Sequence, residues 1–263
     1  SQEVYWIFKS YQNNILLSAQ LCVSDPLVLN AQTITASDCD YGFTTTDAGW
    51  VNMGLPKQNE YVNTDLNGDG TTDSGYSVGS AVNSWTDKSG KGYHMIKSGN
   101  PTWAKFGDNG VVNFDGDDAL YSSNYWGGGK EFTMFSVARY THSTNTQRVI
   151  SDRSRNWLFG FENGHMQKWF FDGWLTNVAN GKDQLFHIHS ASMNSSDQGN
   201  TYYDGTQVGT VNGTGANDST YVPRQLQFGG WQTTDQFSKC EVAEFLAFDR
   251  VLSNADRQAI EGY

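Results

Sequence analysis

The sequence is poor in several residue types that define common protein classes. Of its 263 residues, 4 are proline, 3 are cysteine and only 17% are charged, against roughly 25% charged residues in an average soluble domain. Lysine and arginine number 17 and aspartate and glutamate 28, which gives a formal net charge of −11. This balance argues against nucleic acid as a partner, because a phosphate backbone requires a basic surface. No apolar run reaches the roughly 18 residues of a membrane-spanning helix, so we expect no transmembrane segment.

Aromatic residues are abundant, with 9 Trp, 13 Tyr and 15 Phe, and they predict a sizeable core. Short segments with alternating apolar and polar residues are separated by turn residues such as Asn-Gly, Asp-Gly and Gly-Gly. These segments are Phe132–Arg139, Trp157–Phe161, Gln167–Phe171, Leu185–Ser190 and Gln225–Phe228. Many short strands with few helices predict a mostly β protein, either a sandwich or a barrel.

Both ends of the chain differ from this pattern. Residues 4–21 carry apolar side chains at helical spacing, among them Val4, Ile7, Tyr11 and Ile15, which predicts an N-terminal amphipathic helix. Residues 27–60 are mixed, with short strand candidates at 27–29 and 33–35. At the C-terminus, Ser253 and Asp256 form a capping-box pattern that predicts a short helix.

Five motifs, taken in chain order, resemble the laminin G-like/concanavalin A-like domains of bacterial secreted proteins. They are VNSWTDKSGKGYH (Val82–His94), VVNFDGDDAL (Val111–Leu120), FTMFSVAR (Phe132–Arg139), YDGTQVG (Tyr203–Gly209) and EVAEFLAFDRVLS (Glu241–Ser253). The resemblance covers roughly residues 76–263. It implies a jelly-roll sandwich of two antiparallel sheets and a role that is usually ligand binding rather than catalysis.

Residues 1–60 lie outside this resemblance and form the first predicted unit, followed by a calcium loop and sandwich over residues 61–263. A helix followed by a cysteine pair resembles a type IV pilin-like protein, here a minor pilin, whose helix contacts other pilin subunits. The alternative is a helical linker from a larger surface protein.

The three cysteines do not form a disulfide framework. Cys22 and Cys39 flank a polar, turn-rich segment, and we predict a disulfide between them because the Asn/Thr/Gly-rich, Lys-poor composition suits an oxidising, extracellular setting. Such a short loop contributes about 3 kcal/mol of stability. Cys240 lies within an apolar strand and is expected to be a buried thiol. The alternative is three buried thiols.

The strongest local signal for a metal lies at Asp65, Asn67, Asp69, Thr71 and Asp73. Oxygen ligands at positions 1, 3, 5, 7 and 9 with glycine at position 6 are typical of a calcium loop. The loop resembles those of EF-hand, dockerin and thrombospondin-type repeats, except that Tyr76 replaces the usual acidic residue at position 12. We predict one structural Ca²⁺; the alternative is a solvated turn.

Sugar-binding sites commonly present a tryptophan ring to the apolar face of a pyranose while Asn and Asp side chains bind its hydroxyls. Trp126, Trp174 and Trp231 occur in turn-like contexts, Asp172 lies beside Trp174, and Asp118 belongs to an acidic group with Asp115 and Asp117. These acids fit either a turn that ends a strand or a second cation or sugar site. Trp85, Trp157 and Trp169 occur in strand patterns and are expected in the core, and packing remains the alternative for each loop tryptophan.

Catalytic signatures are weak. Glu241 and Glu244 are three apart, so a regular strand places them on opposite faces, and His187 and His189 have no third ligand at a recognisable zinc spacing. The sequence therefore predicts a non-catalytic, calcium-stabilised adhesion module on the cell surface or outside the cell that binds a glycan or surface partner. The alternatives are a glycan-degrading hydrolase or lyase and a purely structural pilus or surface-layer subunit.

Overall fold

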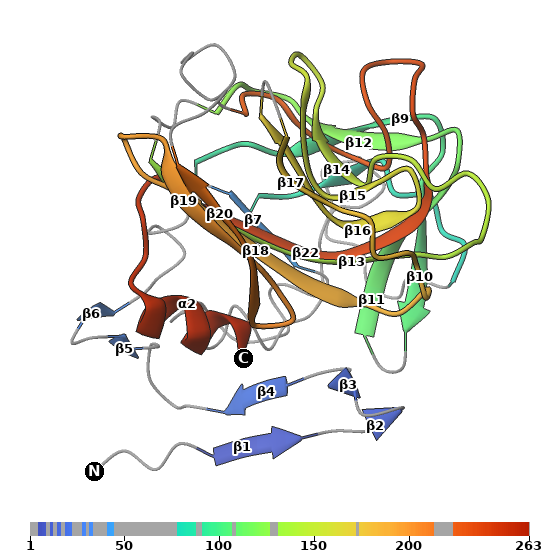
Figure 1. Cartoon of the computed structure of the whole chain (residues 1–263). Helices are drawn as coiled ribbons and strands as arrows, with labels where there is room; N and C mark the ends of the chain where they lie inside the picture. The colour runs from blue at the N-terminus through green and yellow to red at the C-terminus, as the bar shows by residue number, and fades with distance from the viewer. Residues whose placement is uncertain are drawn as a thin grey trace.

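A computed structural model shows two antiparallel sheets packed face to face, with one short helix near the C-terminus (Figure 1). It describes residues 78–87, 91–106, 109–126, 131–171, 174–212 and 223–262, together with the backbone of seven short strands within the first 44 residues. The mostly β, two-sheet sandwich expected from the sequence is confirmed.

The first sheet, called the β13 sheet, has the strand order β10-β11-β22-β13-β18-β19-β20. Its strands are β10 (Thr102–Phe106), β11 (Asn109–Asp115), β22 (Lys239–Phe248), β13 (Phe132–Tyr140), β18 (His187–Met193), β19 (Gln198–Tyr203) and β20 (Thr206–Asn212). A strand from the first part of the chain, β7 (Tyr41–Thr44), also pairs with β22. The domain boundary predicted at residue 60 stays a prediction.

The second sheet, called the β15 sheet, has the strand order β17-β16-β15-β14-β21-β12-β9-β8. Its strands are β17 (Trp174–Val178), β16 (His165–Phe171), β15 (Trp157–Glu162), β14 (Ile150–Asp152), β21 (Leu226–Phe228), β12 (Ala119–Ser122), β9 (Met95–Ser98) and β8 (Ser84–Trp85). Turn residues follow several of these strands, such as Asn163-Gly164 after β15 and Gly229-Gly230 after β21, as the sequence indicated.

The core lies between the two sheets and is strongly aromatic. Trp85, Trp157 and Trp169 are at most 1% exposed, which confirms their predicted core positions. Phe132 and Phe159 contact Trp169 edge-on, each with ring centroids 6.2 Å apart. Edge-to-face contacts of this kind fix ring orientation as well as burying area.

The helix α2 (Asn254–Glu261) packs on β18 of the β13 sheet. The Ser253 hydroxyl accepts a hydrogen bond from the Asp256 backbone N–H at 3.1 Å and donates to the Asp256 carboxylate at 2.7 Å. The predicted short helix with Ser253 as its N-cap is therefore confirmed. The Asp256 carboxylate binds the Ser253 hydroxyl, whereas in a full capping box it would accept from the Ser253 backbone N–H.

The predicted N-terminal helix is wrong where the backbone of residues 4–21 is described. The assigned elements there are the strands β1 (Tyr5–Phe8), β2 (Tyr11–Gln12), β3 (Ile15–Leu16) and β4 (Ala19–Cys22). β1 pairs with β4 in antiparallel register and β2 pairs with β3. Aromatic and β-branched residues such as those of Tyr5–Phe8 favour strands, and this preference overrides apolar spacing that also fits a helix.

Strand candidates further along this segment are partly confirmed, since β5 (Val28–Leu29) pairs with β6 (Gln32–Thr33). Cys39 and the calcium loop at 65–73 lie outside the described residues, so the disulfide and the metal site stay predictions. Cys240 is a free thiol, fully buried in β22, and burial raises its pKa well above the ordinary value. No helix in the described part of the chain is long and apolar enough to cross a membrane.

Candidate functional site

The candidate site lies on the outer face of the β15 sheet, the face turned away from the core. Strand register places one row of side chains directly beside one another across seven strands of this face. The alternate residues of these strands, including Ile150, Phe159 and Phe228, belong to the core, so the row must face outward. In spatial order the row is Ile96, Tyr121, Gln227, Ser151, Leu158, Phe170 and Trp174.

Four aromatic rings on or beside this face each have a cationic side chain stacked against them, and we call this set the cation–aromatic band. The distances from the cation to the ring centroid are 5.1 Å for Lys168–Trp174, 4.2 Å for Arg148–Trp231, 3.6 Å for Arg153–Tyr121 and 4.8 Å for Arg224–Tyr125. All are within the roughly 6 Å range of a cation–π contact. The band combines ring faces with fixed positive charges at the end of the sheet that carries the β14–β15 turn.

Trp174 is the most exposed of the three predicted sugar-binding tryptophans. It begins β17, is 44% exposed, and contacts Phe170 edge-on with centroids 5.2 Å apart. Lys168, one strand away, also donates a hydrogen bond to the Asn177 side-chain oxygen. The indole is thus held in a defined orientation at the surface, as a stacking platform requires.

Trp231 is half-buried against the β14–β15 turn, where its indole N–H donates to the Arg155 carbonyl at 3.0 Å. Arg148 lies over its ring and donates to the side-chain oxygens of Gln236 at 2.6 Å and Asn156 at 2.8 Å. Burial lowers the pKa of Arg148 to about 10, against the opposing effect of Glu162 and Asp235. The guanidinium therefore keeps its charge at neutral pH.

Asp152 at the end of β14 fixes the two arginines nearest β12. It is fully buried, and one carboxylate oxygen accepts from the Ser154 N–H, the Ser154 hydroxyl and the Arg155 N–H at 2.7–2.8 Å. The other oxygen accepts from the backbone N–H groups of Arg224 and Gln225. Because these donors flank Arg153 and include the Arg224 N–H, the carboxylate holds the two loops that carry Arg153 and Arg224.

One side chain of the outer-face row and one of the cation–aromatic band have buried polar atoms without a hydrogen-bond partner. Gln227, in the middle of the outer-face row, is 0% exposed, and neither its amide oxygen nor its amide nitrogen is hydrogen-bonded. One guanidinium nitrogen of Arg153 is likewise buried and unpaired. Buried polar groups without a hydrogen-bond partner are rare because each costs about 1–3 kcal/mol.

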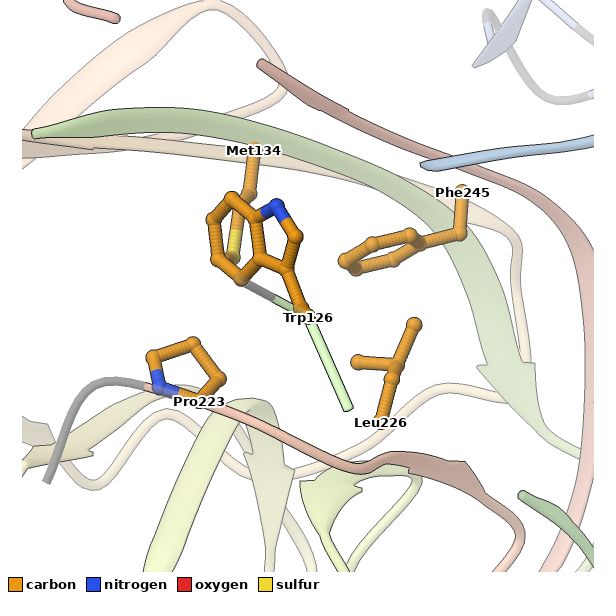
Figure 2. A pocket seen from close by; sticks show the side chains of 5 residues that line it. All are labelled: Trp126, Met134, Pro223, Leu226 and Phe245. Carbon is orange, nitrogen blue, oxygen red and sulfur yellow. The ribbon is translucent and has the colours of Figure 1, made fainter. Parts of the chain in front are cut away.

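Trp126 does not belong to this site, although its sequence context predicted an exposed ring. It is 4% exposed and lines a small apolar gap in the core with Met134, Pro223, Leu226 and Phe245 (Figure 2). Its backbone N–H donates to the Arg224 carbonyl at 2.6 Å, which anchors the loop and turns the indole inward. A buried ring cannot stack on a sugar, so Trp126 is not part of the candidate site.

The acidic candidates lie elsewhere. Asp118 is 2% exposed and sits in the loop between β11 and β12 with the exposed Asp115 and Asp117, all within 4.8 Å of one another. Burial and these two neighbours raise the pKa of Asp118 to about 7. The chain turns after β11, and the alternative of a second cation or sugar site at these acids stays a prediction. Asp118 is buried and does not belong to the outer face of the β15 sheet. Asp172 lies outside the described residues.

The two histidines of β18 point into the structure and have separate partners. His187 lies between Asp183 at 3.0 Å and Asp204 at 2.7 Å. Although burial opposes the charged form, these carboxylates raise the pKa of His187 above its ordinary value. Burial lowers the pKa of His189 to about 4, and its Nε2 donates to the Met166 carbonyl. Neither histidine belongs to a metal-ligand cluster in the described residues.

The prediction that Glu241 and Glu244 face opposite sides is wrong. A β-bulge at Ala243 places Glu241 opposite Arg139 and Glu244 opposite Val137, on one face of the β13 sheet. An extra residue in one strand shifts the alternation by one, which spacing alone could not show. The Glu241 carboxylate is held by the Arg139 guanidinium at 2.7 Å.

The cations of the band were not found from the sequence. Arg153 contacts Tyr121, and Arg148 contacts Trp231, although the partners are far apart in the chain. The alternation in each strand could have indicated which residues face outward, but only the strand order brings these partners together.

No protein-family profile matches the chain, and no curated protein matches it in sequence. Among solved structures, it is similar to domain 4 of the extracellular arabinanase AbnA from Geobacillus stearothermophilus, in complex with arabinotriose. That match has a TM-score of 0.51 and 10% identity, and it covers 70% of this chain and 100% of that domain.

Two toxin binding domains are also similar. The binding domain of Paraclostridial Mosquitocidal Protein 1 has a TM-score of 0.53 and 9% identity, over 71% of this chain and 51% of that one. The ligand-binding domain of botulinum neurotoxin serotype D, in complex with N-acetylneuraminic acid, has a TM-score of 0.52 and 13% identity, over 70% and 49%. The chain thus spans about half of each toxin domain. At these identities the comparisons establish a shared β-sandwich fold.

Proposed function

We propose that this protein is a glycan-binding module that uses the outer face of the β15 sheet. The observation that carries the proposal is the cation–aromatic band, in which the exposed Trp174 ring is held beside Lys168, Asn177 and Phe170. Aromatic rings cover the apolar face of a sugar while nearby polar groups bind its hydroxyls.

The fold supports this proposal by analogy. The arabinanase domain was solved with arabinotriose and the neurotoxin domain with N-acetylneuraminic acid. Sandwiches of this type serve as scaffolds on which different sites are built, so the ligand of this chain must be read from its own surface.

We further propose that the module binds without catalysis and acts outside the cell or on its surface. The neighbours are binding domains of a secreted arabinanase and of toxins, and the low lysine content suits an extracellular protein. Among the described residues, the band contains rings, cations and amides and no pair of closely placed carboxylates of the kind that glycoside hydrolysis uses.

A glycan array combined with an assay for released reducing sugar tests this function. We expect the protein to retain at least one class of oligosaccharide and to release no product from it. Release of product would identify an enzyme, and the absence of binding to every sugar would favour a purely structural subunit.

We also propose that a loop formed by Asp65, Asn67, Asp69, Thr71 and Asp73 binds one structural Ca²⁺. Ca²⁺ should raise the melting temperature, because a ligand bound only by the folded state stabilises it by mass action.

Thermal melts with Ca²⁺ or with a chelator test this proposal. Asp69→Ala should abolish the Ca²⁺-dependent rise, whereas the control Asp249→Asn, at an exposed acid after β22, should retain it. A wild-type melting temperature that the chelator does not change would contradict the calcium site.

A further inference from the structure

Some cations of the described residues are paired with carboxylates and others are not. On the β13 sheet and α2, Arg139 is paired with Glu241, Arg257 with Glu261, and His187 with Asp183 and Asp204, whereas Lys105 of β10 lies over the ring of Trp103. In the cation–aromatic band, the cations are Lys168, Arg148, Arg153 and Arg224. Within the described residues, none of these four forms an ion pair with a carboxylate.

Lys168 is the clearest example of a cation that forms no ion pair with a carboxylate in the described residues. It is only 7% exposed, yet its ammonium has a ring and a neutral amide oxygen as partners, those of Trp174 and Asn177. A ring and a neutral amide oxygen are weaker partners for an ammonium than a carboxylate is. An anion arriving from solution would supply the missing partner.

Arg148 and Arg153 also form no ion pair with a carboxylate in the described part of the chain. Arg148 is 7% exposed; it lies over the Trp231 ring and donates to Gln236, Asn156 and the Trp157 carbonyl, while the charges of Glu162 and Asp235 act on it without an ion pair. Arg153 has a buried guanidinium nitrogen with no hydrogen-bond partner. The nearby Asp152 carboxylate forms no ion pair with these cations within the described residues, and its oxygens accept from backbone N–H groups and the Ser154 hydroxyl.

The chain as a whole carries a net charge of −11. A surface with unpaired cations in an acidic protein attracts a short ligand that carries a few negative groups, whereas the net charge repels a long polyanion. Guanidinium groups also present two parallel N–H donors, which suit the paired oxygens of a carboxylate or a sulfate ester.

Resting on the proposed glycan-binding function, we propose that the ligand is an acidic glycan whose anionic groups contact Lys168 and Arg153 while its sugar rings stack on Trp174 and Tyr121. By strand spacing, the β16 and β12 ends of the outer-face row are roughly 20 Å apart. An oligosaccharide of several residues can therefore reach both ends of the band.

Isothermal titration with matched pairs of sugars tests this inference. The pairs are sialylated and desialylated oligosaccharides, oligogalacturonate and its methyl ester, and sulfated and unsulfated galactose oligosaccharides. We expect the acidic member of at least one pair to bind at least about tenfold more tightly than its neutral counterpart. The pair that shows this difference distinguishes a carboxylate ligand from a sulfate ester.

Lys168→Gln should weaken binding of that acidic sugar about tenfold and leave the neutral sugar unchanged. The matched control is Lys105→Gln, because Lys105 also lies over a tryptophan ring, 5.7 Å from the centroid of Trp103, but in β10 of the other sheet. Arg153→Gln is a second variant that should show the same selective loss if Lys168→Gln proves poorly folded in a thermal melt.

Equal binding of acidic and neutral members of every pair would overturn this inference and leave the glycan-binding function intact. The same holds if Lys168→Gln and Arg153→Gln, both folded, bind the acidic sugar as well as the wild type does. Failure of the wild type to bind any sugar would overturn both proposals.

Discussion

Asp152→Ala should unfold at much lower urea concentration than the wild type, with a loss of about 3–5 kcal/mol in the free energy of unfolding. The substitution removes a fully buried carboxylate and leaves its donors without an acceptor, among them the backbone N–H groups of Ser154, Arg155 and Gln225. It should also weaken glycan binding under conditions where the variant is folded, because Arg153 and Arg224 lose the group that holds their loops.

Two further variants make this prediction specific. Asp152→Asn keeps one oxygen acceptor and should lie between the wild type and Asp152→Ala. Ser154→Ala removes only the hydroxyl donor to the carboxylate and should cost about 1 kcal/mol or less. Equal stability of Asp152→Ala and Ser154→Ala in urea unfolding would show that the carboxylate does not hold these loops.

Trp174→Ala should reduce affinity for the glycan found on the array at least about tenfold. The ring is the most exposed of the band's tryptophans and is fixed by Phe170 and Lys168, so its loss removes a preorganised stacking surface. The free energy of unfolding should change little, because the indole is 44% exposed and outside the core.

The control for this prediction is Val251→Ala, which removes an apolar side chain of the same 44% exposure between β22 and α2. It should bind the glycan like the wild type. Similar losses of affinity in the two variants would mean that Trp174 has no specific contact with the sugar.

Local signals in the sequence predicted much of the fold. The sequence shows alternation and residues three apart directly. These signals predicted the strand that contains FTMFSVAR, the core positions of Trp157 and Trp169, and the N-cap at Ser253. The N-terminal helix failed because aromatic and β-branched residues at helical spacing pair as strands instead.

The candidate site was harder to predict. Trp126 follows turn-forming residues, yet its ring packs in the core against Phe132, since a turn at the backbone does not determine where a large side chain is buried. The roles proposed for Lys168 and Arg153 depend on their aromatic partners, Trp174 and Tyr121, which the strand order places beside them. Sequence alternation indicates a face, but it does not indicate which strands are neighbours.

The most direct test of the central claim is a nuclear magnetic resonance titration of the isotopically labelled protein with the glycan found on the array. The account predicts that the indole N–H of Trp174 and the signals of Lys168, Arg153 and Tyr121 shift as the sugar is added, while the indole of Trp103 on the other sheet does not. Shifts confined to the β13 sheet and α2, with Trp174 unchanged, would contradict the account.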